Sequence, residues 1–280
     1  MLPPAVALAA CGAGDDTGDG GAAEGLGEDV QLVQRFPQVL VPGRVRIPVS
    51  LARASGLLGA DARLPDVLDG RIVDAVSGDT VVASVSARRH GEASAVPYWP
   101  FIVDLAAVGT YTLVVDGASP DGASFSVQDR AAVAVAGAGD VLAPHDGPTL
   151  ADPRGVSPIC TRHPDPCPFH EVTLREALAV GRPVAYLVGT PAHCSTGTCA
   201  PGLEALIEVA ARHGDAVTCV HAEVYADEAA TVVAPAVEAA GLTYEPALWV
   251  ADARGRVVAR LDAVFDSDEI ADAFASAGVS

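Results

Sequence analysis

The sequence lacks lysine and asparagine altogether, and all 17 of its basic residues are arginines. Acidic residues outnumber them, 36 to 17, which leaves a formal net charge of -19 over 280 residues. A surface of that sign repels phosphate backbones, so nucleic-acid binding is disfavoured. The missing lysine and asparagine are a compositional bias to which we assign no function.

Charged residues are also few, at 19% of the chain, whereas half of the residues are apolar. Disordered chains show the opposite balance, so the composition predicts a soluble protein with ordinary hydrophobic cores. The length corresponds to about two domains.

The apolar run at residues 2–10 is too short to span a bilayer. It leads into Cys11 through Leu8-Ala9-Ala10, which resembles the lipobox of bacterial lipoproteins, where the cysteine is acylated. Residues 12–29 are rich in Gly, Ala and acids, as expected of a disordered tether. We therefore expect residues 1–11 to be a signal segment, Cys11 to carry a lipid, and the protein to be extracytoplasmic and membrane-anchored.

The alternatives are a secreted protein and a disordered N-terminus with an unmodified cysteine. No basic residue precedes the apolar run, although signal peptides normally have one there.

Alternation of apolar and polar residues predicts β-strands at 44–51, 81–85, 111–115 and 125–127. Turn-forming residues are found at 69–70, 77–79 and 119–122. Residues 30–130 are therefore predicted to form an all-β sandwich. Gly109-Thr110-Tyr111 resembles the tyrosine corner of immunoglobulin-like domains, which implies a fold of that class.

The predicted sandwich has no cysteine, and His90 is its only histidine. We find no catalytic constellation there and expect a role in spacing or partner binding. Tyr98, Trp99 and Phe101 are interpreted as core residues, with an exposed docking patch as the alternative.

Residues 131–158 show little periodicity and are predicted to be a linker. Cys160, His163, Cys167 and His170 follow it and allow two interpretations. Two Cys-x-x-His pairs suit a tetrahedral zinc site. Outside the cytoplasm, however, the two thiols would oxidise, so we favour a Cys160–Cys167 disulfide and predict no metal or other cofactor.

Residues 159–280 alternate between helical and strand patterns, which predicts an α/β domain with helices on both faces of a sheet. Strands are expected at 183–188, 216–224, 247–250 and 257–261. Helices are expected after the capping box at Thr173–Glu176, at 203–212, at 229–240 and after Asp266.

Cys194 and Cys199 follow the first of these strands, and Pro246 precedes the third. This arrangement resembles the thioredoxin-like superfamily over roughly the last 110 residues. The segment from Thr190 to Pro201 is also similar to a branch of secreted actinobacterial thioredoxin-like lipoproteins. The resemblance implies a thioredoxin-like fold, thiol–disulfide exchange with protein thiols and disulfides, and a cis Pro246 facing the cysteines.

The cysteine spacing departs from that family, because four residues separate Cys194 from Cys199 instead of two. On a continuous helix the two would lie more than about 8 Å apart, beyond the ~7 Å limit for a disulfide. We therefore predict a loop bulged at Gly197 and a helix that begins near Cys199 or Pro201. The strand position where thioredoxins bury an acid is Val188, so that proton acceptor is missing.

Together these features predict a thiol–disulfide oxidoreductase. Cys194 is the expected attacking thiolate, with its pKa lowered by the helix N-terminus and by His193. Cys199 would resolve the mixed disulfide. The alternative is a non-catalytic binding or scaffold lipoprotein in which the pair is a structural disulfide.

Cys219, His221 and Glu223 alternate along one strand and are expected on one face. With Cys194 and Cys199, His221 resembles the copper site of Sco-type proteins, which implies copper binding as a further alternative. A buried hydrogen-bonded histidine and a core thiol are the favoured interpretations of His221 and Cys219. The sequence gives no oligomeric state.

Overall fold

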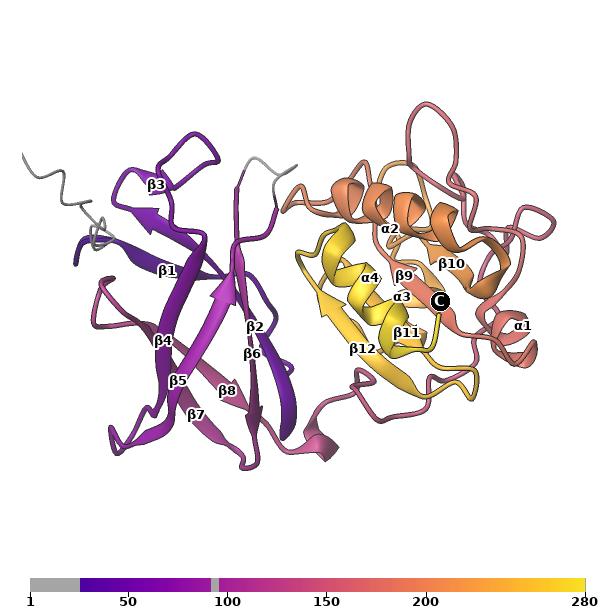
Figure 1. Cartoon of the computed structure of the whole chain (residues 1–280). Helices are drawn as coiled ribbons and strands as arrows, with labels where there is room; N and C mark the ends of the chain where they lie inside the picture. The colour runs from indigo at the N-terminus through magenta and orange to yellow at the C-terminus, as the bar shows by residue number, and fades with distance from the viewer. Residues whose placement is uncertain (1–25, 92–95, 280) are drawn as a thin grey trace, which may run out of the picture.

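The computed structural model describes residues 26–91 and 96–279. Cys11, the predicted signal segment and most of the predicted tether lie outside the described residues. The described chain forms two parts side by side, a strand-rich part with β1–β8 and a part with β9–β12 and α1–α4 (Figure 1). Among the described residues, no helix combines the length and the apolar character needed to cross a membrane.

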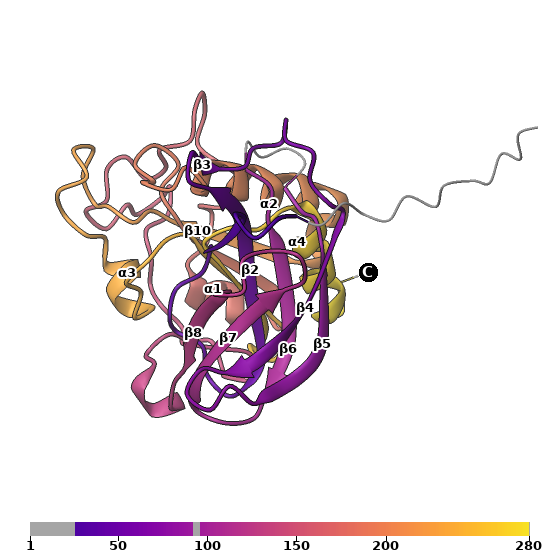
Figure 2. The same cartoon turned by 90° about the vertical axis from the view of Figure 1, so that its left-hand side faces the viewer.

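The strand-rich part consists of two four-stranded antiparallel sheets. In Figure 2 it lies toward the viewer, in front of the part with the helices. The first sheet contains β1 (Gln31–Gln34), β2 (Gly43–Arg53), β3 (Gly56–Leu57) and β6 (Trp99–Leu105). The second has the order β5 (Thr80–Arg88), β4 (Val67–Asp74), β7 (Gly109–Val115) and β8 (Ala123–Val127).

Both sheets contribute apolar side chains to one core, as the alternating pattern predicts. Tyr98, Trp99 and Phe101 are 1%, 0% and 0% exposed, so they are buried and do not form a surface patch. The Tyr111 hydroxyl donates to the carbonyl oxygen of Ala107 at 2.9 Å, which is the hydrogen bond expected of a tyrosine corner.

The predicted turn at Asp69-Gly70 is wrong, because both residues lie within β4. Gly70 is needed there for a close approach of two backbones: a Cβ at this position would lie 2.4 Å from the carbonyl oxygen of Val114 on β7. The turns at 77–79 and 119–122 are confirmed.

The second part contains a four-stranded mixed sheet. Its order is β10 (Thr218–Ala222), β9 (Val184–Val188), β11 (Ala247–Ala251) and β12 (Val257–Asp262). Strand β10 runs parallel to β9, whereas β11 is antiparallel to both β9 and β12. The helices are α1 (Leu174–Ala179), α2 (Cys199–His213), α3 (Pro235–Ala239) and α4 (Ser267–Ser276).

Helices cover both faces of this sheet. Leu187 and Leu248 point to the face packed against α2 and α4. Tyr186 and Trp249 point to the opposite face, where α1 and α3 contribute buried residues. Because side chains alternate along β9 and β11, each strand supplies both cores.

The N-terminal ends of two helices follow the predicted capping chemistry. Thr173 and Glu176 form a capping box at α1, and the Asp266 carboxylate accepts from the Glu269 amide at α4. The helix predicted at 229–240 is shorter than expected and spans only Pro235–Ala239. The reason is a turn in which the Asp227 carboxylate accepts from backbone amides of residues 231 and 232.

Residues 131–158 contain almost no regular secondary structure, as predicted for a linker, yet they are packed onto the C-terminal sheet. Val133, Val135 and Leu142 are buried in the same core as α1 and α3. The indole of Trp249 donates to the carbonyl oxygen of Ala136 at 2.9 Å. This stretch is therefore a covering layer and not a free connection.

Candidate functional site

Cys194 and Cys199 flank the N-terminal end of α2. Gly197 lies between them with a φ of 68°, which bends the loop as predicted. Helix α2 begins at Cys199, whose backbone N–H donates to Cys194 Sγ at 3.3 Å. Cys194 is partly exposed, whereas Cys199 is only 1% exposed. The loop therefore brings the two cysteines together despite their four-residue separation.

Hydrogen bonds favour the thiolate form of Cys194. The strongest of these is the hydrogen bond from the Cys199 thiol, and Thr196 and the backbone at 198 and 199 add to it. Together they outweigh partial burial and lower the pKa of Cys194 to about 4. The same interaction, with burial, raises the pKa of Cys199 far above its ordinary value. One thiol is thus activated and the other is held protonated.

His193, which is predicted to lower the pKa of Cys194, packs against another aromatic ring. Its ring lies edge-on against Tyr225, with centroids 6.1 Å apart. The main groups that lower the pKa of Cys194 are Cys199 and the threonines of the loop.

Pro246 is in the cis form and immediately precedes β11, as the resemblance implies. It lies next to Gly189, which follows β9: a Cβ on Gly189 would be 3.3 Å from Pro246 Cβ and 3.7 Å from Cys199 Sγ. Pro246, Gly189 and Cys199 therefore pack closely against one another.

Glu245 is a site residue that the sequence analysis missed. Its carboxylate lies within 4.8 Å of the sulfurs of Cys194 and Cys199. Burial is the main reason that the pKa of Glu245 rises to about 7, and the charges of Cys194 and Glu223 add to it. Its Oε2 atom is buried with no hydrogen-bond partner among the described residues.

An acid is therefore near the cysteine pair, although not at the strand position where thioredoxins have one. That position, Val188, is fully buried in the core on the other face of the sheet. The only sequence signal for Glu245 is its position directly before Pro246.

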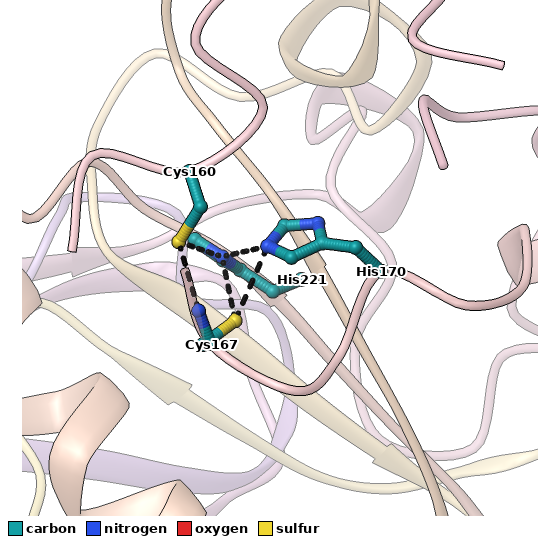
Figure 3. Close-up of side chains that lie close together, drawn as sticks. All are labelled: Cys160, Cys167, His170 and His221. Atoms are coloured by element: carbon teal, nitrogen blue, oxygen red, sulfur yellow. Dashed lines mark hydrogen bonds between the residues drawn. The ribbon is translucent and has the colours of Figure 1, made fainter. Parts of the chain in front are cut away.

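A second cluster lies beneath this loop and contains Cys160, Cys167, His170 and His221 (Figure 3). Both cysteines are free thiols in the structure, in place of the predicted disulfide. The hydrogen bond with Cys167 is the strongest of the interactions that lower the pKa of Cys160, and the two histidines add to it. His163, a ligand only in the alternative zinc interpretation, is exposed and is not part of the cluster, in which His221 from β10 is the fourth member.

His221 is also separate from the first cysteine pair. Its Nδ1 atom faces Cys160 and Cys167, and its Nε2 atom lies 3.0 Å from the carbonyl oxygen of Gly189. Both ring nitrogens are thus engaged, so the copper set of Cys194, Cys199 and His221 is not assembled.

Glu223 takes part in a hydrogen-bond network, and Cys219 packs against the core. Glu223 Oε1 accepts from the amide of Thr161 at 2.6 Å and from its hydroxyl at 2.9 Å, and the same hydroxyl accepts from the Ala192 amide. Cys219 is partly buried and packs against the core, and burial raises its pKa to about 12.

No protein-family model, curated protein or solved structure matches this chain.

The arrangement provides an accessible thiolate, a buried second thiol and a carboxyl group close to both sulfurs. A thiolate and a second thiol are the two groups that thiol–disulfide exchange uses.

Proposed function

We propose that this protein is an extracytoplasmic, membrane-anchored thiol–disulfide oxidoreductase that acts on protein thiols and disulfides through Cys194 and Cys199. One observation carries the proposal: the α2 N-terminal amide of Cys199 donates to the accessible sulfur of Cys194, while the second sulfur is buried directly behind it. A structural disulfide would have no need for one activated and one protected thiol.

The proposed fold assignment supports this function. We assign residues 159–280 to a thioredoxin-like domain for three reasons. Strands β9 and β10 are parallel and are connected by α2 in a βαβ unit, β11 and β12 form an antiparallel hairpin, and a cis proline precedes β11. We assign residues 30–130 to an immunoglobulin-like sandwich because of its two antiparallel sheets and the Tyr111–Ala107 hydrogen bond.

In the first step, the Cys194 thiolate attacks one sulfur of a substrate disulfide. A bond forms between Cys194 and that sulfur, the substrate S–S bond breaks, and the second substrate sulfur leaves as a thiolate that takes up a proton. The low pKa of Cys194 keeps the attacking form populated at neutral pH.

In the second step, Cys199 attacks the Cys194 sulfur of the mixed disulfide. Its proton passes to the Glu245 carboxylate and then to the departing substrate thiolate. The substrate gains two electrons and two protons, and the Cys194–Cys199 pair becomes a disulfide. The same steps in reverse oxidise a substrate dithiol.

The test is the reduction potential of the Cys194–Cys199 pair, obtained by trapping thiols across a graded dithiol buffer and identifying the peptides by mass spectrometry. We expect a reversible couple between about -270 and -120 mV. A value below roughly -300 mV, or a bond that resists reduction until the protein unfolds, would support the scaffold alternative instead.

An activity assay with a disulfide-bonded peptide provides the matched controls. Cys194→Ser should abolish turnover, and Cys199→Ser should accumulate the mixed disulfide. Cys219→Ser removes another free cysteine of the same domain and should leave turnover unchanged. Equal activity of Cys194→Ser and the native protein would rule out the proposed mechanism.

We propose separately that Cys11 carries the membrane anchor. Native-host membranes should contain the protein, and the mass of its N-terminal peptide should show an acylated cysteine. An unmodified Cys11 peptide from a soluble fraction would contradict the anchor while leaving the exchange chemistry in place.

A further inference from the structure

Three metal-binding side chains of one segment and a fourth from β10 meet in the interior of the C-terminal part. They are Cys160, Cys167, His170 and His221, and all four are buried. Each offers one ligand atom, and these atoms lie within 4.8 Å of one another. Figure 3 shows the two sulfurs and the two imidazoles pointing toward a common centre.

The distances between the ligand atoms match a tetrahedral zinc site. Zinc bonds of about 2.3 Å to sulfur and about 2.05 Å to nitrogen place S and N about 3.5 Å apart, and two N atoms about 3.3 Å apart. Cys167 Sγ lies 3.2 Å from His170 Nε2 and 3.4 Å from His221 Nδ1. Cys160 Sγ lies 3.7 Å from His221 Nδ1, and the two imidazole nitrogens are 3.3 Å apart.

The charge of such a site suits its burial. Two thiolates and two neutral imidazoles around a divalent cation have no net charge, so no uncompensated charge is placed in the core. Binding releases the proton of each thiol that is not already ionised.

The surroundings of His221 fix the tautomer that a metal needs. Its Nε2–H donates to the carbonyl oxygen of Gly189 at 3.0 Å, which leaves the lone pair of Nδ1 directed at the two sulfurs. A backbone carbonyl in this position is a usual partner of a metal-bound histidine.

A disulfide explains this cluster less completely than a metal. It would use the two cysteines alone and leave two imidazole nitrogens facing each other in the interior. A metal uses all four side chains. Because two sulfurs and two nitrogens in tetrahedral geometry are typical of zinc, and because the protein supplies all four ligands, the donor set favours a closed structural zinc site.

We propose that Cys160, Cys167, His170 and His221 bind one structural zinc ion. The ion ties the segment with Cys160, Cys167 and His170 to β10, which carries His221. It also supports the loop that leads to Cys194 through two hydrogen bonds. His221 donates to the carbonyl oxygen of Gly189, and the hydroxyl of Thr161, the residue after Cys160, accepts from the Ala192 amide. This proposal does not depend on the thiol–disulfide exchange proposed above.

The first test is the metal content of the purified full-length protein, produced and refolded with zinc available. We expect one zinc per chain, and competition with a chelator should show affinity at least about 100-fold weaker in Cys167→Ser and His221→Ala. Two matched variants should keep the metal: His163→Ala, which removes the exposed histidine of the same segment, and Cys194→Ser/Cys199→Ser, which removes the other cysteine pair.

A second measurement does not require the ligand variants to fold. Zinc X-ray absorption of the unaltered protein should give two sulfur and two nitrogen neighbours, and cobalt substitution should give the strong visible absorption of a tetrahedral site. Metal-free protein after refolding with zinc, together with a Cys160–Cys167 disulfide in its peptide map, would overturn the proposal. Loss of zinc in Cys194→Ser/Cys199→Ser would overturn the ligand assignment.

Discussion

Arg46 on β2 and Glu269 on α4 form a two-point ion pair that joins the two parts of the molecule. Arg46 Nε lies 2.7 Å from Glu269 Oε1, and Arg46 Nη2 lies 2.7 Å from Glu269 Oε2. The two side chains are only 10% and 9% exposed. The Tyr98 hydroxyl also donates to Glu269 at 2.7 Å, so the carboxylate is held by two residues of the sandwich.

Removing one partner of this ion pair should destabilise the protein strongly. Arg46→Met leaves the Glu269 carboxylate buried without its counter-charge, a change that typically costs about 3–5 kcal/mol. Denaturant unfolding measures the effect, and Arg53→Met is the control because its ion pair with Asp29 is exposed. A double variant Arg46→Met/Glu269→Leu should recover much of the loss; equal losses in the two arginine variants would contradict the argument.

The contact between His90 of the sandwich and Asp266 of the C-terminal part should make stability depend on pH. Burial disfavours the charged form of His90, but the hydrogen bond and charge of Asp266 outweigh it and raise the pKa of His90; Glu269 adds to the effect and Arg46 opposes it. The pKa of Asp266 is lowered, because its hydrogen bonds to His90 and the Gly91 amide outweigh the effect of burial.

The directions of these two pKa shifts define the pH range in which the His90–Asp266 contact stabilises the protein. The stability due to His90 is fully present below pH about 6.5 and is lost as pH rises through the higher pKa of the folded state. The stability due to Asp266 is lost as pH falls through its lowered pKa. Thermal unfolding of the native protein should therefore show a decrease in stability above pH 6.5 that is smaller in His90→Gln. Identical profiles of the two proteins would refute this contribution.

Cys194 should react as a thiolate well below neutral pH. Its alkylation rate with iodoacetamide should stay near its maximum down to pH about 5 and fall to half at a pH of about 4. An ordinary cysteine has its midpoint near about 8.5. Thr196→Ala removes a hydroxyl 3.2 Å from the sulfur and should raise the midpoint. A native midpoint near 8.5 would show that these hydrogen bonds do not activate the thiol.

Glu245→Gln should slow the second step of exchange without affecting the first. In the native protein the resolution rate of the mixed disulfide should rise with pH as Glu245 ionises. Its midpoint should lie between about 4.5 and 7, because burial still raises the pKa of Glu245 whereas the Cys194 charge is absent in that intermediate.

In Glu245→Gln this inflection should disappear and resolution should slow about 100-fold. Stopped-flow mixing with a small disulfide measures the step, and the alkylation rate of Cys194 at pH 7, where its thiolate is fully formed in both proteins, is the control that should not change. A retained inflection in the variant would assign the proton acceptor to another group.

Replacing Gly70 should destabilise the sandwich. Gly70→Ala places a methyl group 2.4 Å from the Val114 carbonyl oxygen, so β4 and β7 must move apart, at a typical cost of about 1–3 kcal/mol. Gly147→Ala is the matched control, since its new Cβ would be 3.5 Å from its nearest neighbour, an ordinary contact. Equal unfolding midpoints for the two variants would contradict the close approach.

Local chemistry was readable from the sequence because it depends on residues close together in the chain. The capping box at Thr173–Glu176, the N-cap at Asp266 and the helix start at Cys199 needed only neighbours within a few positions. The alternating strands of the sandwich core were predictable for the same reason, since one buried face imposes a period of two.

Errors arose where a distant segment set the outcome. Asp69-Gly70 has the composition of a turn, but β7 requires a glycine at this point of β4. Residues 131–158 lack periodicity, and only the tertiary structure shows that Val133, Val135 and Leu142 are buried against one face of the C-terminal sheet.

The same distinction applies to the two cysteine sites. The sequence by itself determined the Cys194–Cys199 loop, because the glycine bend and the helix start lie within it. Only the tertiary structure placed Glu245 beside that pair and His221 beside Cys160, 61 residues away. Side chains so far apart in the chain meet through strand pairing and helix packing, and sequence spacing alone carries no information about that distance.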